Sequence, residues 1–348
     1  MKFKINLLTA LLIAASSSGA FACASCGCSL NTDLQTQGMS SNPGWAFDVR
    51  YDYLNQNHLR FGTGTISNSA AVGTTNPKTL TLAEVEAYTR NNYLTSSLDY
   101  NNGETWGATV ILPFIQRDHM TFGNDDPAGG GWPSGTNGYT SHASGFGDVK
   151  IIGRYFGLSE QKNWGLQFGI KLPTGNNAQT APLANGGGVT AVDPGLQLGT
   201  GSTDLIVGAY RFGHIQGTDN WGYFGNMQFQ AAVAPKSTPV NIDALGASSG
   251  SYRPGNSLNL NGGVNYQGFD KFTPTVQFNF IDKKADTGLA ADTWATGGTL
   301  IYLTPGVLFS PSDSVQYYAN VQIPIYQNLN GIQLAPSLIG SVGLRVHF

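Results

Sequence analysis

Three cysteines provide the most concentrated chemistry in this 348-residue sequence. Cys23, Cys26 and Cys28 are its only cysteines, and the C-x₂-C-x-C spacing places three thiols within six residues. Thiolates suit soft ions such as Cu(I) or Zn²⁺, although a structural zinc site usually has four ligands. The spacing therefore predicts a trigonal Cu(I) site, or a zinc site completed by an outside ligand. A disulfide between two of the thiols in an oxidising compartment is an open alternative.

The cysteines follow a segment with the features of a secretory signal peptide. Lys2 and Lys4 precede an apolar stretch over residues 5–15, and Ala20-Phe21-Ala22 matches the A-x-A cleavage pattern. We predict a signal peptide at residues 1–22. A buried N-terminal helix is the alternative, and so is a lipoprotein signal with lipid on Cys23. The lipoprotein interpretation is disfavoured, because such signals usually carry Leu where Ala20 stands.

The composition excludes several classes of protein. Charged residues make up only 11% of the chain, and the net charge of −3 argues against a nucleic-acid partner. The apolar fraction of 41% argues against disorder. No apolar run reaches the ~18 residues of a membrane-spanning helix.

Alternating apolar and polar residues dominate the chain from Trp45 onward. Phe47, Val49 and Tyr51 alternate with Asp48 and Arg50, as in a strand with one apolar and one polar face. Most such segments have 10–14 residues, which suits a tilted strand that crosses a bilayer. The twelve segments lie near 46–55, 89–100, 105–117, 147–157, 163–173, 203–213, 221–233, 257–267, 272–282, 297–309, 314–327 and 336–348. We predict an all-β fold, a transmembrane antiparallel up-and-down β-barrel of about 12 strands with an N-terminal periplasmic segment.

The connections between the segments alternate between short turns and longer loops, as in outer-membrane barrels. An even number of strands then places both chain ends on the short-turn side, which is periplasmic. A soluble β-sandwich would show the same alternation of faces. Strand length, the signal peptide and aromatic residues at strand ends favour the barrel; these aromatics are Trp45, Trp106, Trp164, Trp221, Tyr155 and Tyr223.

The C-terminus resembles the recognition signal of outer-membrane barrels, in the pattern Ser341-x-Gly343-x-x-Val346-x-Phe348. The resemblance implies delivery to the barrel-assembly machinery through these four residues. The alternation agrees, because Leu338, Val342, Leu344, Val346 and Phe348 fall on one apolar row.

Glycine-containing motifs in the middle of the chain resemble a transporter family. They are Gly147-Asp148-Val149, G-I-K-L-P-T-G at 169–175, L-G-T-G-S-T-D at 198–204 and Leu303-Thr304-Pro305-Gly306. Over roughly 145–345 the chain looks like the outer-membrane family labelled "putative MetA-pathway of phenol degradation". The resemblance implies a barrel and suggests transport without a firm substrate. A purely structural role of these residues is also open, since Pro173 can end a strand and Gly199 permits tight backbone.

Ten charged residues are predicted to face the lumen, because a charge facing lipid near the midplane is destabilising by about 2–4 kcal/mol. They are Asp48, Arg50, Asp52, Arg90, Asp99, Arg117, Lys150, Arg154, Lys171 and Arg345. Seven of the ten are basic, so an open lumen would favour anionic solutes. The alternative is that these charges pair with one another and fill a narrow barrel.

Enzymatic chemistry has little support in the sequence. His142-Ala143-Ser144 has the His-x-Ser spacing of outer-membrane phospholipases, but it falls in a Gly-rich stretch at 129–147. A Ser–His pair needs an orienting third group, which a loop without a neighbouring Asn does not supply. Asp125 and Asp126, just before this stretch, are a weak candidate for Ca²⁺. We therefore expect no enzyme.

These observations predict three parts: a signal peptide (1–22), a Cys-containing periplasmic or lumenal segment (23–43) and an outer-membrane β-barrel (44–348). The predicted function is a bacterial outer-membrane channel or passive transporter for small solutes, with lipid as a partner. Two alternatives are a barrel scaffold whose cysteine segment binds metal or a redox partner, and an outer-membrane hydrolase.

Overall fold

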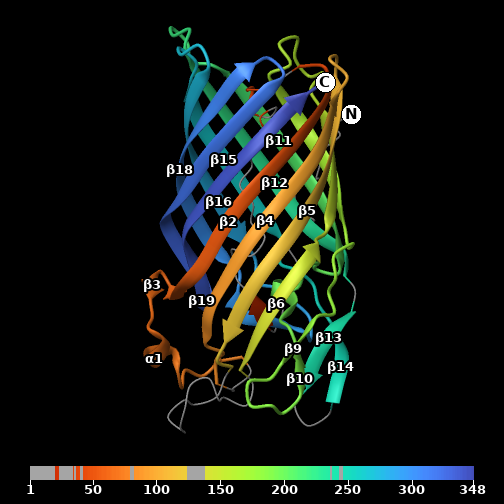
Figure 1. Cartoon of the computed structure of the whole chain (residues 1–348), viewed down its shortest axis with the longest axis vertical. Helices are drawn as coiled ribbons and strands as arrows, with labels where there is room; N and C mark the ends of the chain where they lie inside the picture. The colour runs from red at the N-terminus through yellow and green to blue at the C-terminus, as the bar shows by residue number, and fades with distance from the viewer. Residues whose placement is uncertain are drawn as a thin grey trace, which may run out of the picture.

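The computed structural model describes residues 20–22, 34, 37–39, 42–78, 82–123, 138–235, 237–242 and 246–348. They form a tall antiparallel β-barrel (Figure 1). Within the described residues, eleven strand elements make the closed ring: β2 (Gly44–Gly62), β4 (Glu86–Asn101), β5 (Trp106–Thr121), β7 (Val149–Tyr155), β8 (Trp164–Leu172), β11 (Ser202–His214), β12 (Trp221–Pro235), β15 (Ser257–Tyr266), β16 (Phe272–Lys283), β18 (Gly298–Ser312) and β19 (Val315–His347). Two further strands, β3 (Gly64–Thr65) and β6 (Tyr139–Phe146), pair with β2 and β5.

The ring contains one strand element fewer than the predicted twelve, because β19 folds back on itself. The N–H of His347 donates to the carbonyl of Ser314 at 2.8 Å, and Gln327 Nε2 donates to the carbonyl of Pro336 at 3.1 Å. The first half of β19 pairs with β18 and the second half pairs with β2. Two of the predicted segments, 314–327 and 336–348, therefore lie in one element.

The two ends of the barrel differ in their connections, as the sequence predicts. Short turns occupy residues 102–105, 156–163, 215–220, 267–271 and 313–314. This end also holds the C-terminus (Figure 1), where Phe348 and Trp45 exchange backbone hydrogen bonds of 2.9 and 3.2 Å. The opposite end carries the longer connections, with α1 (Asn68–Ala71), β9 (Thr180–Pro182), β10 (Val189–Ala191), η2 (Pro194–Leu196), β13 (Ser237–Ile242), β14 (Gly246–Ser251) and β17 (Ala291–Thr296). None of the helices in the described ranges is long and apolar enough to span a membrane.

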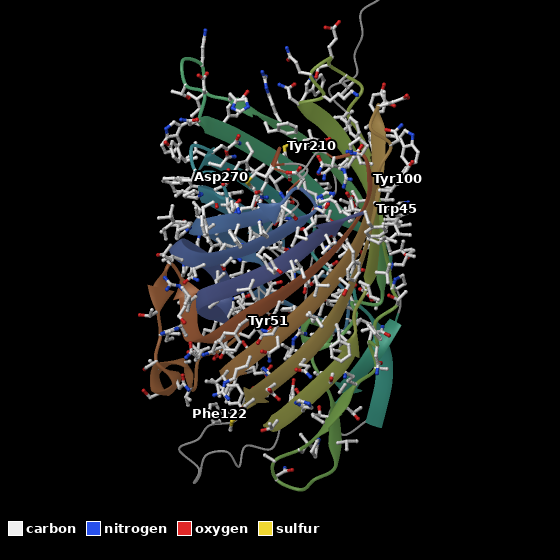
Figure 2. The ribbon with its side chains drawn as sticks, turned by 45° about the horizontal axis from the view of Figure 1, so that its top comes forward. Trp45, Tyr51, Tyr100, Phe122, Tyr210 and Asp270 are labelled. Carbon is white, nitrogen blue, oxygen red and sulfur yellow. The ribbon has the colours of Figure 1, made fainter. Side chains whose placement is uncertain are left out.

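The outer face of the barrel is apolar and carries aromatic side chains near the short-turn end. Trp45 packs on Tyr100, and Tyr100 packs on Trp106, with ring centroids 4.8 and 5.4 Å apart. Figure 2 shows Trp45 and Tyr100 together at the outer edge. On the outer face at the opposite side of the barrel, Trp221 packs on Tyr266, with ring centroids 5.1 Å apart. This arrangement is typical of the aromatic girdle that lies at a membrane interface.

The apolar band on the outer face ends before the long-connection end. On β5 the outward row runs from Trp106 to Phe114, a length that suits the 9–11 residues of a tilted membrane-spanning strand. The next outward positions on the same strand are Gln116 and Asp118. The part of β5 beyond Phe114 therefore projects past the band that lipid would cover.

Candidate functional site: the barrel lumen

The lumen contains a cavity of about 360 Å³ with a mixed wall. Five acidic and six basic residues line it, together with apolar side chains that include Ile111, Ile115, Ile152 and Leu198. Eight of the ten predicted lumen residues lie in this lining: Asp48, Arg50, Asp52, Asp99, Lys150, Arg154, Lys171 and Arg345. These eight residues lie on β2, β4, β7, β8 and β19, on the inner face that the two-residue period predicts for those strands.

Asp99 is the centre of one group of paired charges in the lumen. Its two carboxylate oxygens accept hydrogen bonds from Arg154 at 2.5 Å and from Arg345 at 2.9 Å. Thr109 also donates to Asp99, at 2.6 Å, and all three charged side chains are almost completely buried. These arginines are therefore neutralised in part, and they contribute less to the field in the lumen than free cations would.

Arg50 and Asp52 form a second pair near the same strands. Arg50 Nε donates to Asp52 Oδ2 at 2.8 Å, and Ser341 donates to the other oxygen of Asp52 at 2.6 Å. Tyr318 donates to Asp48 at 2.9 Å. Asp48, Arg50 and Asp52 come from one strand, so their inward direction follows directly from the two-residue period of β2.

Lys171 is the centre of the third group, which unites three of the four glycine-containing motifs, those at 147–149, 169–175 and 198–204. Its ammonium lies 2.9 Å from Asp148 and 3.4 Å from Asp204, and it also donates to Thr200 and Ser202. Asp148 accepts further hydrogen bonds from the N–H groups of Gly175 and Thr200, at 3.0 and 2.9 Å. These motifs thus form one buried cluster in which two carboxylates share one ammonium and accept further hydrogen bonds, and this role of Asp148 and Asp204 was not predicted from the sequence.

Two glycines allow the backbones around this cluster to approach. A Cβ on Gly199 would lie 2.4 Å from the carbonyl oxygen of Gly175, and one on Gly175 would lie 2.7 Å from the Cα of Gly199. Real Cβ atoms do not approach backbone so closely, so both positions require glycine. Gly175 of the K-L-P-T-G piece and Gly199 of the G-T-G-S-T-D piece are therefore structural, as one interpretation of the sequence held.

Two of the predicted lumen residues lie outside the cavity lining. Arg90 is exposed on the outer face between the buried Thr89 and Asn91, and its guanidinium lies 4.5 Å over the Tyr88 ring. The prediction for Arg90 is wrong, because Arg90 and Asp99 are an odd number of residues apart and cannot share one face of a regular strand. Arg117 does point inward, but it is buried against the wall and a loop.

This loop, residues 192–198, folds into the lumen and is called here the constriction loop. Arg117 holds it by donating to the carbonyls of Gly195 and Gln197, at 3.2 and 3.1 Å. Gln197 fastens the base of the loop by donating to the carbonyl of Val192 at 2.6 Å. Leu196 is buried among Tyr139, Ala181 and Val192. The loop therefore narrows the lumen near the long-connection end.

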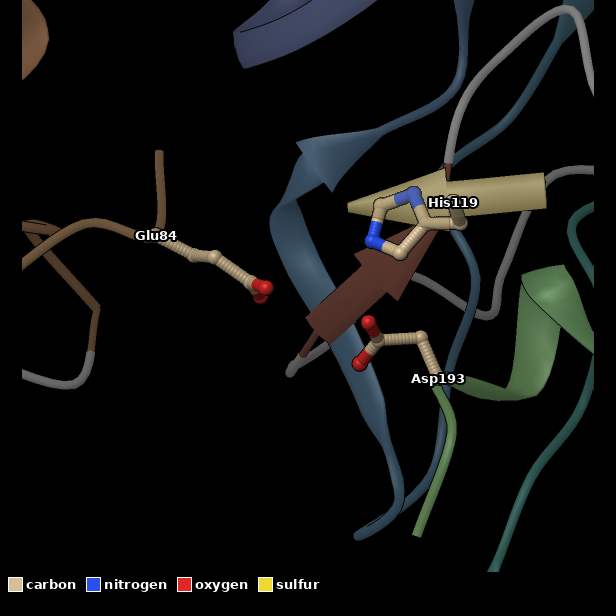
Figure 3. Close-up of side chains that lie close together, drawn as sticks. All are labelled: Glu84, His119 and Asp193. Atoms are coloured by element: carbon tan, nitrogen blue, oxygen red, sulfur yellow. The ribbon is translucent and has the colours of Figure 1, made fainter. Parts of the chain in front are cut away.

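Beside the constriction loop, Glu84, His119 and Asp193 come together from three segments (Figure 3). One ligand atom from each residue lies within 4.8 Å of those of the other two. Burial and the negative charge of Asp193 raise the pKa of Glu84 well above its ordinary value. Burial and the charge of Asp292 also raise the pKa of Asp193, to about 6, although a hydrogen bond from Tyr139 opposes this shift. The sequence analysis did not find this cluster.

Parts of the N-terminal segment also lie inside the barrel. Leu34 packs against Leu308 and Tyr318, and Gln316 donates to the carbonyl of Met39 at 2.9 Å. Ala20–Ala22 (β1) pair in parallel with β17. Cys23, Cys26 and Cys28 lie outside the described residues, as do Asp125 and Asp126, so the predicted metal sites at these positions stay predictions.

The His-x-Ser element lies on a strand and not in a loop. His142 and Ser144 are exposed on the outer face of β6, and His142 Nδ1 lies 2.5 Å from Asp118 Oδ1. In the described part of the chain no hydrogen bond joins Ser144 to His142. The serine is therefore not activated in this arrangement.

The C-terminal residues occupy the faces that the sequence predicts. Leu338, Val342 and Phe348 are exposed on the outer face, with 47%, 54% and 74% of their surface accessible. Ser341 and Arg345 are buried on the inner face. The apolar row of the terminal pattern thus faces the region where lipid would lie.

Solved structures with a similar fold include membrane β-barrels. An outer membrane channel from Pseudomonas putida F1 matches 88% of this chain and 96% of its own, with a TM-score of 0.61 and 13% sequence identity. The β domain of the Bordetella autotransporter Brka matches 88% of this chain and 100% of its own, with a TM-score of 0.50 and 12% identity. This likeness shows that the chain has the fold of an outer-membrane β-barrel. No protein-family model and no curated protein matches the chain, so the resemblance to the phenol-degradation transporter family stays a prediction.

Proposed function

We propose that this protein is a channel of the bacterial outer membrane that lets small solutes pass by diffusion. The observation that carries the proposal is the division of the wall into an apolar outer face, with aromatic residues near the short-turn end, and an inner face that encloses a cavity with charged and apolar lining. Only a closed barrel satisfies every backbone group of a sheet in lipid. The likeness of the fold to an outer membrane channel supports the same conclusion.

The lining of the cavity limits which solutes suit the channel. Acidic and basic residues are nearly balanced around the cavity, and those centred on Asp99 and Lys171 are paired. The pairing argues for weak charge selectivity, in line with the alternative of mutually paired charges and not with the anion preference that seven basic residues suggested. The apolar wall at Ile111, Ile115 and Ile152 suits small organic solutes with both an apolar body and a polar group.

We further propose that residues 1–22 are a signal peptide and that residues 23–43 remain in the periplasm or lumen. Removal of residues 1–22 would take β1 from its place beside β17 and widen the space next to the constriction loop. In this proposal the cysteine segment presents Cys23, Cys26 and Cys28 to Cu(I) or zinc. Thiol counting and elemental analysis of the reduced mature protein distinguish a metal site from a disulfide and from lipidated Cys23.

The C-terminal pattern supports recognition by the barrel-assembly machinery. Deletion of Phe348 removes both its exposed ring and its two backbone hydrogen bonds to Trp45. We expect loss of membrane insertion and degradation of the unassembled chain, measured as disappearance of a heat-modifiable band from outer-membrane fractions. Wild-type levels of that band in the deletion would contradict the recognition signal.

The transport proposal is tested by conductance of the purified protein in planar bilayers. We expect discrete current steps and only weak preference between anions and cations. A folded, inserted barrel that never conducts would instead favour a scaffold role.

A further inference from the structure

We propose that Glu84, His119 and Asp193 form a binding site for a divalent transition-metal cation such as Zn²⁺. The site would lie beside the constriction loop, beyond the apolar band of the barrel. It uses none of the three cysteines and does not depend on the transport proposal.

The first argument is the convergence of the three side chains. Figure 3 shows Glu84 and Asp193 reaching toward the His119 ring. Their candidate ligand atoms lie within 4.8 Å of one another. Zinc bonds of about 2.0–2.2 Å require ligand atoms somewhat closer than this, so the site needs a modest inward movement. Glu84 can supply this movement, because its side chain is long and only half-buried.

The second, independent argument is the state of the His119 ring. The side chain is completely buried, and its Nε2 atom has no hydrogen-bond partner. The other ring nitrogen, Nδ1, lies 2.8 Å from Thr89 Oγ1. A buried polar atom without a partner is destabilising by about 1–3 kcal/mol, and an Nε2 lone pair directed between two carboxylates is what a metal ion would use. The contact of Nδ1 with Thr89 fixes the ring orientation, as the outer partner of a metal-bound histidine does.

The third argument is the excess of negative charge around the ring. The negative charges of Asp193, Glu86 and Asp292 each repel the Glu84 carboxylate. The cations near the group are Arg117, which acts on His119, and Lys78, which acts on Asp292. Arg117 is already bound to the constriction loop, and Lys78 Nζ lies 3.1 Å from the carbonyl of Thr293. A divalent cation would therefore relieve the repulsion among the carboxylates.

The ligand types select the class of metal. Ca²⁺ and Mg²⁺ prefer sites made only of oxygen atoms, whereas one imidazole with two carboxylates suits zinc and similar transition metals. Three protein ligands leave a fourth position for water. The Tyr139 hydroxyl holds one oxygen of Asp193 at 2.5 Å, which orients this carboxylate toward the ring.

A bound ion would join three separate parts of the barrel. Glu84 precedes β4 and is fixed to the end of β5 through Val85, whose N–H donates to Gly123 O at 3.0 Å and whose carbonyl accepts from Phe122 N at 3.0 Å. His119 belongs to β5, and Asp193 is the N-cap of η2 in the constriction loop. The metal would thus tie the constriction loop to the barrel wall.

The test is calorimetric titration of the full chain with ZnCl₂ after treatment with a chelator. All proteins carry Cys23, Cys26 and Cys28 changed to Ser, so that thiol sites do not contribute. We expect one saturable site. His119→Gln and Asp193→Asn should each weaken it at least about tenfold, which even the loss of an outer partner can cause. The matched control is His142→Gln, because His142 also contacts an aspartate but is exposed on the outer face.

A second readout covers variants that fold poorly. Glu84→Gln changes a residue that lies in a connection and not in a strand, and its binding of Co²⁺ can be followed by visible absorption. We expect weak d–d bands in the cysteine-free protein and their loss in Glu84→Gln. Absence of a saturable Zn²⁺ site in the cysteine-free chain would overturn the proposal, and so would Zn²⁺ or Co²⁺ binding that none of the three substitutions alters.

Discussion

The cluster around Lys171 and the cluster around His119 both lie inside the barrel, but their charges are balanced differently. Lys171 is held by Asp148 and Asp204, and these carboxylates also accept hydrogen bonds from backbone and side-chain donors. His119 lies between Glu84 and Asp193 with one ring nitrogen unpartnered. The comparison teaches that a buried ionic group with all its partners within the chain is structural. A group with surplus negative charge and an unpartnered ligand atom is suited to binding a cation that the chain does not supply.

The largest expected effect comes from removing the cation of the Lys171 cluster, whose two carboxylates share it. Lys171→Met leaves Asp148 and Asp204 buried without their cation. Removal of one partner from a buried ion pair is destabilising by about 3–5 kcal/mol, and we expect an effect near the lower end because the lumen admits water. The measurement is the urea midpoint of the heat-modifiable barrel. Lys284→Met is the control, since the Lys284 side chain is 73% exposed and should change the midpoint little.

The residues of the lumen show what the sequence could and could not predict. The two-residue period of β2 places Asp48, Arg50 and Asp52 on the inner face, as predicted. The predicted inward direction fails for Arg90, because Arg90 lies an odd number of residues from the inward-facing Asp99 on the same strand. Asp148 could have been found, since three polar, glycine-rich motifs at strand ends suggest a shared contact. Glu84 and Asp193 could not, because both lie in connections whose inward folding depends on long-range contacts such as Arg117 with Gly195.

A smaller effect should appear when pH changes the unbalanced cluster in the absence of metal. The pKa of Asp193 is raised from 3.8 to about 6 in the folded protein, mainly by burial. The folded state therefore holds a proton that the unfolded state loses above pH 4. By linkage, stability is greatest below pH 4 and falls as pH rises through about 6. The groups that face Asp193 are Tyr139, Glu84, His119 and Asp292.

Hydrogen exchange of residues 192–198 between pH 4 and 7, with a chelator present, measures this effect locally. Correction for the intrinsic pH dependence of exchange is required. We expect protection of the constriction loop to decrease as pH rises, and the decrease to be smaller in Asp193→Asn, where burial still raises the pKa of Glu84. Protection that is constant, or that increases toward pH 7, would contradict the raised pKa of Asp193 in the folded protein.

The smallest expected effect distinguishes the two faces of the wall. Arg90→Gln changes an exposed residue outside the lumen, so ion selectivity should stay at the wild-type value. Arg50→Gln changes a residue of the cavity lining and should shift selectivity slightly toward cations, because Arg50 is already paired with Asp52. Reversal potentials in a salt gradient provide the measurement. A larger shift for Arg90 than for Arg50 would contradict the assignment of the two faces.

The central claim, that the barrel is an outer-membrane channel, is tested most directly by single-channel recording of the wild-type protein purified from outer membranes. The account predicts small, discrete conductance steps that scale with salt concentration, with weak charge selectivity from the paired lining. Folded protein that inserts into the bilayer but yields no steps at any voltage, with or without a chelator, would contradict it.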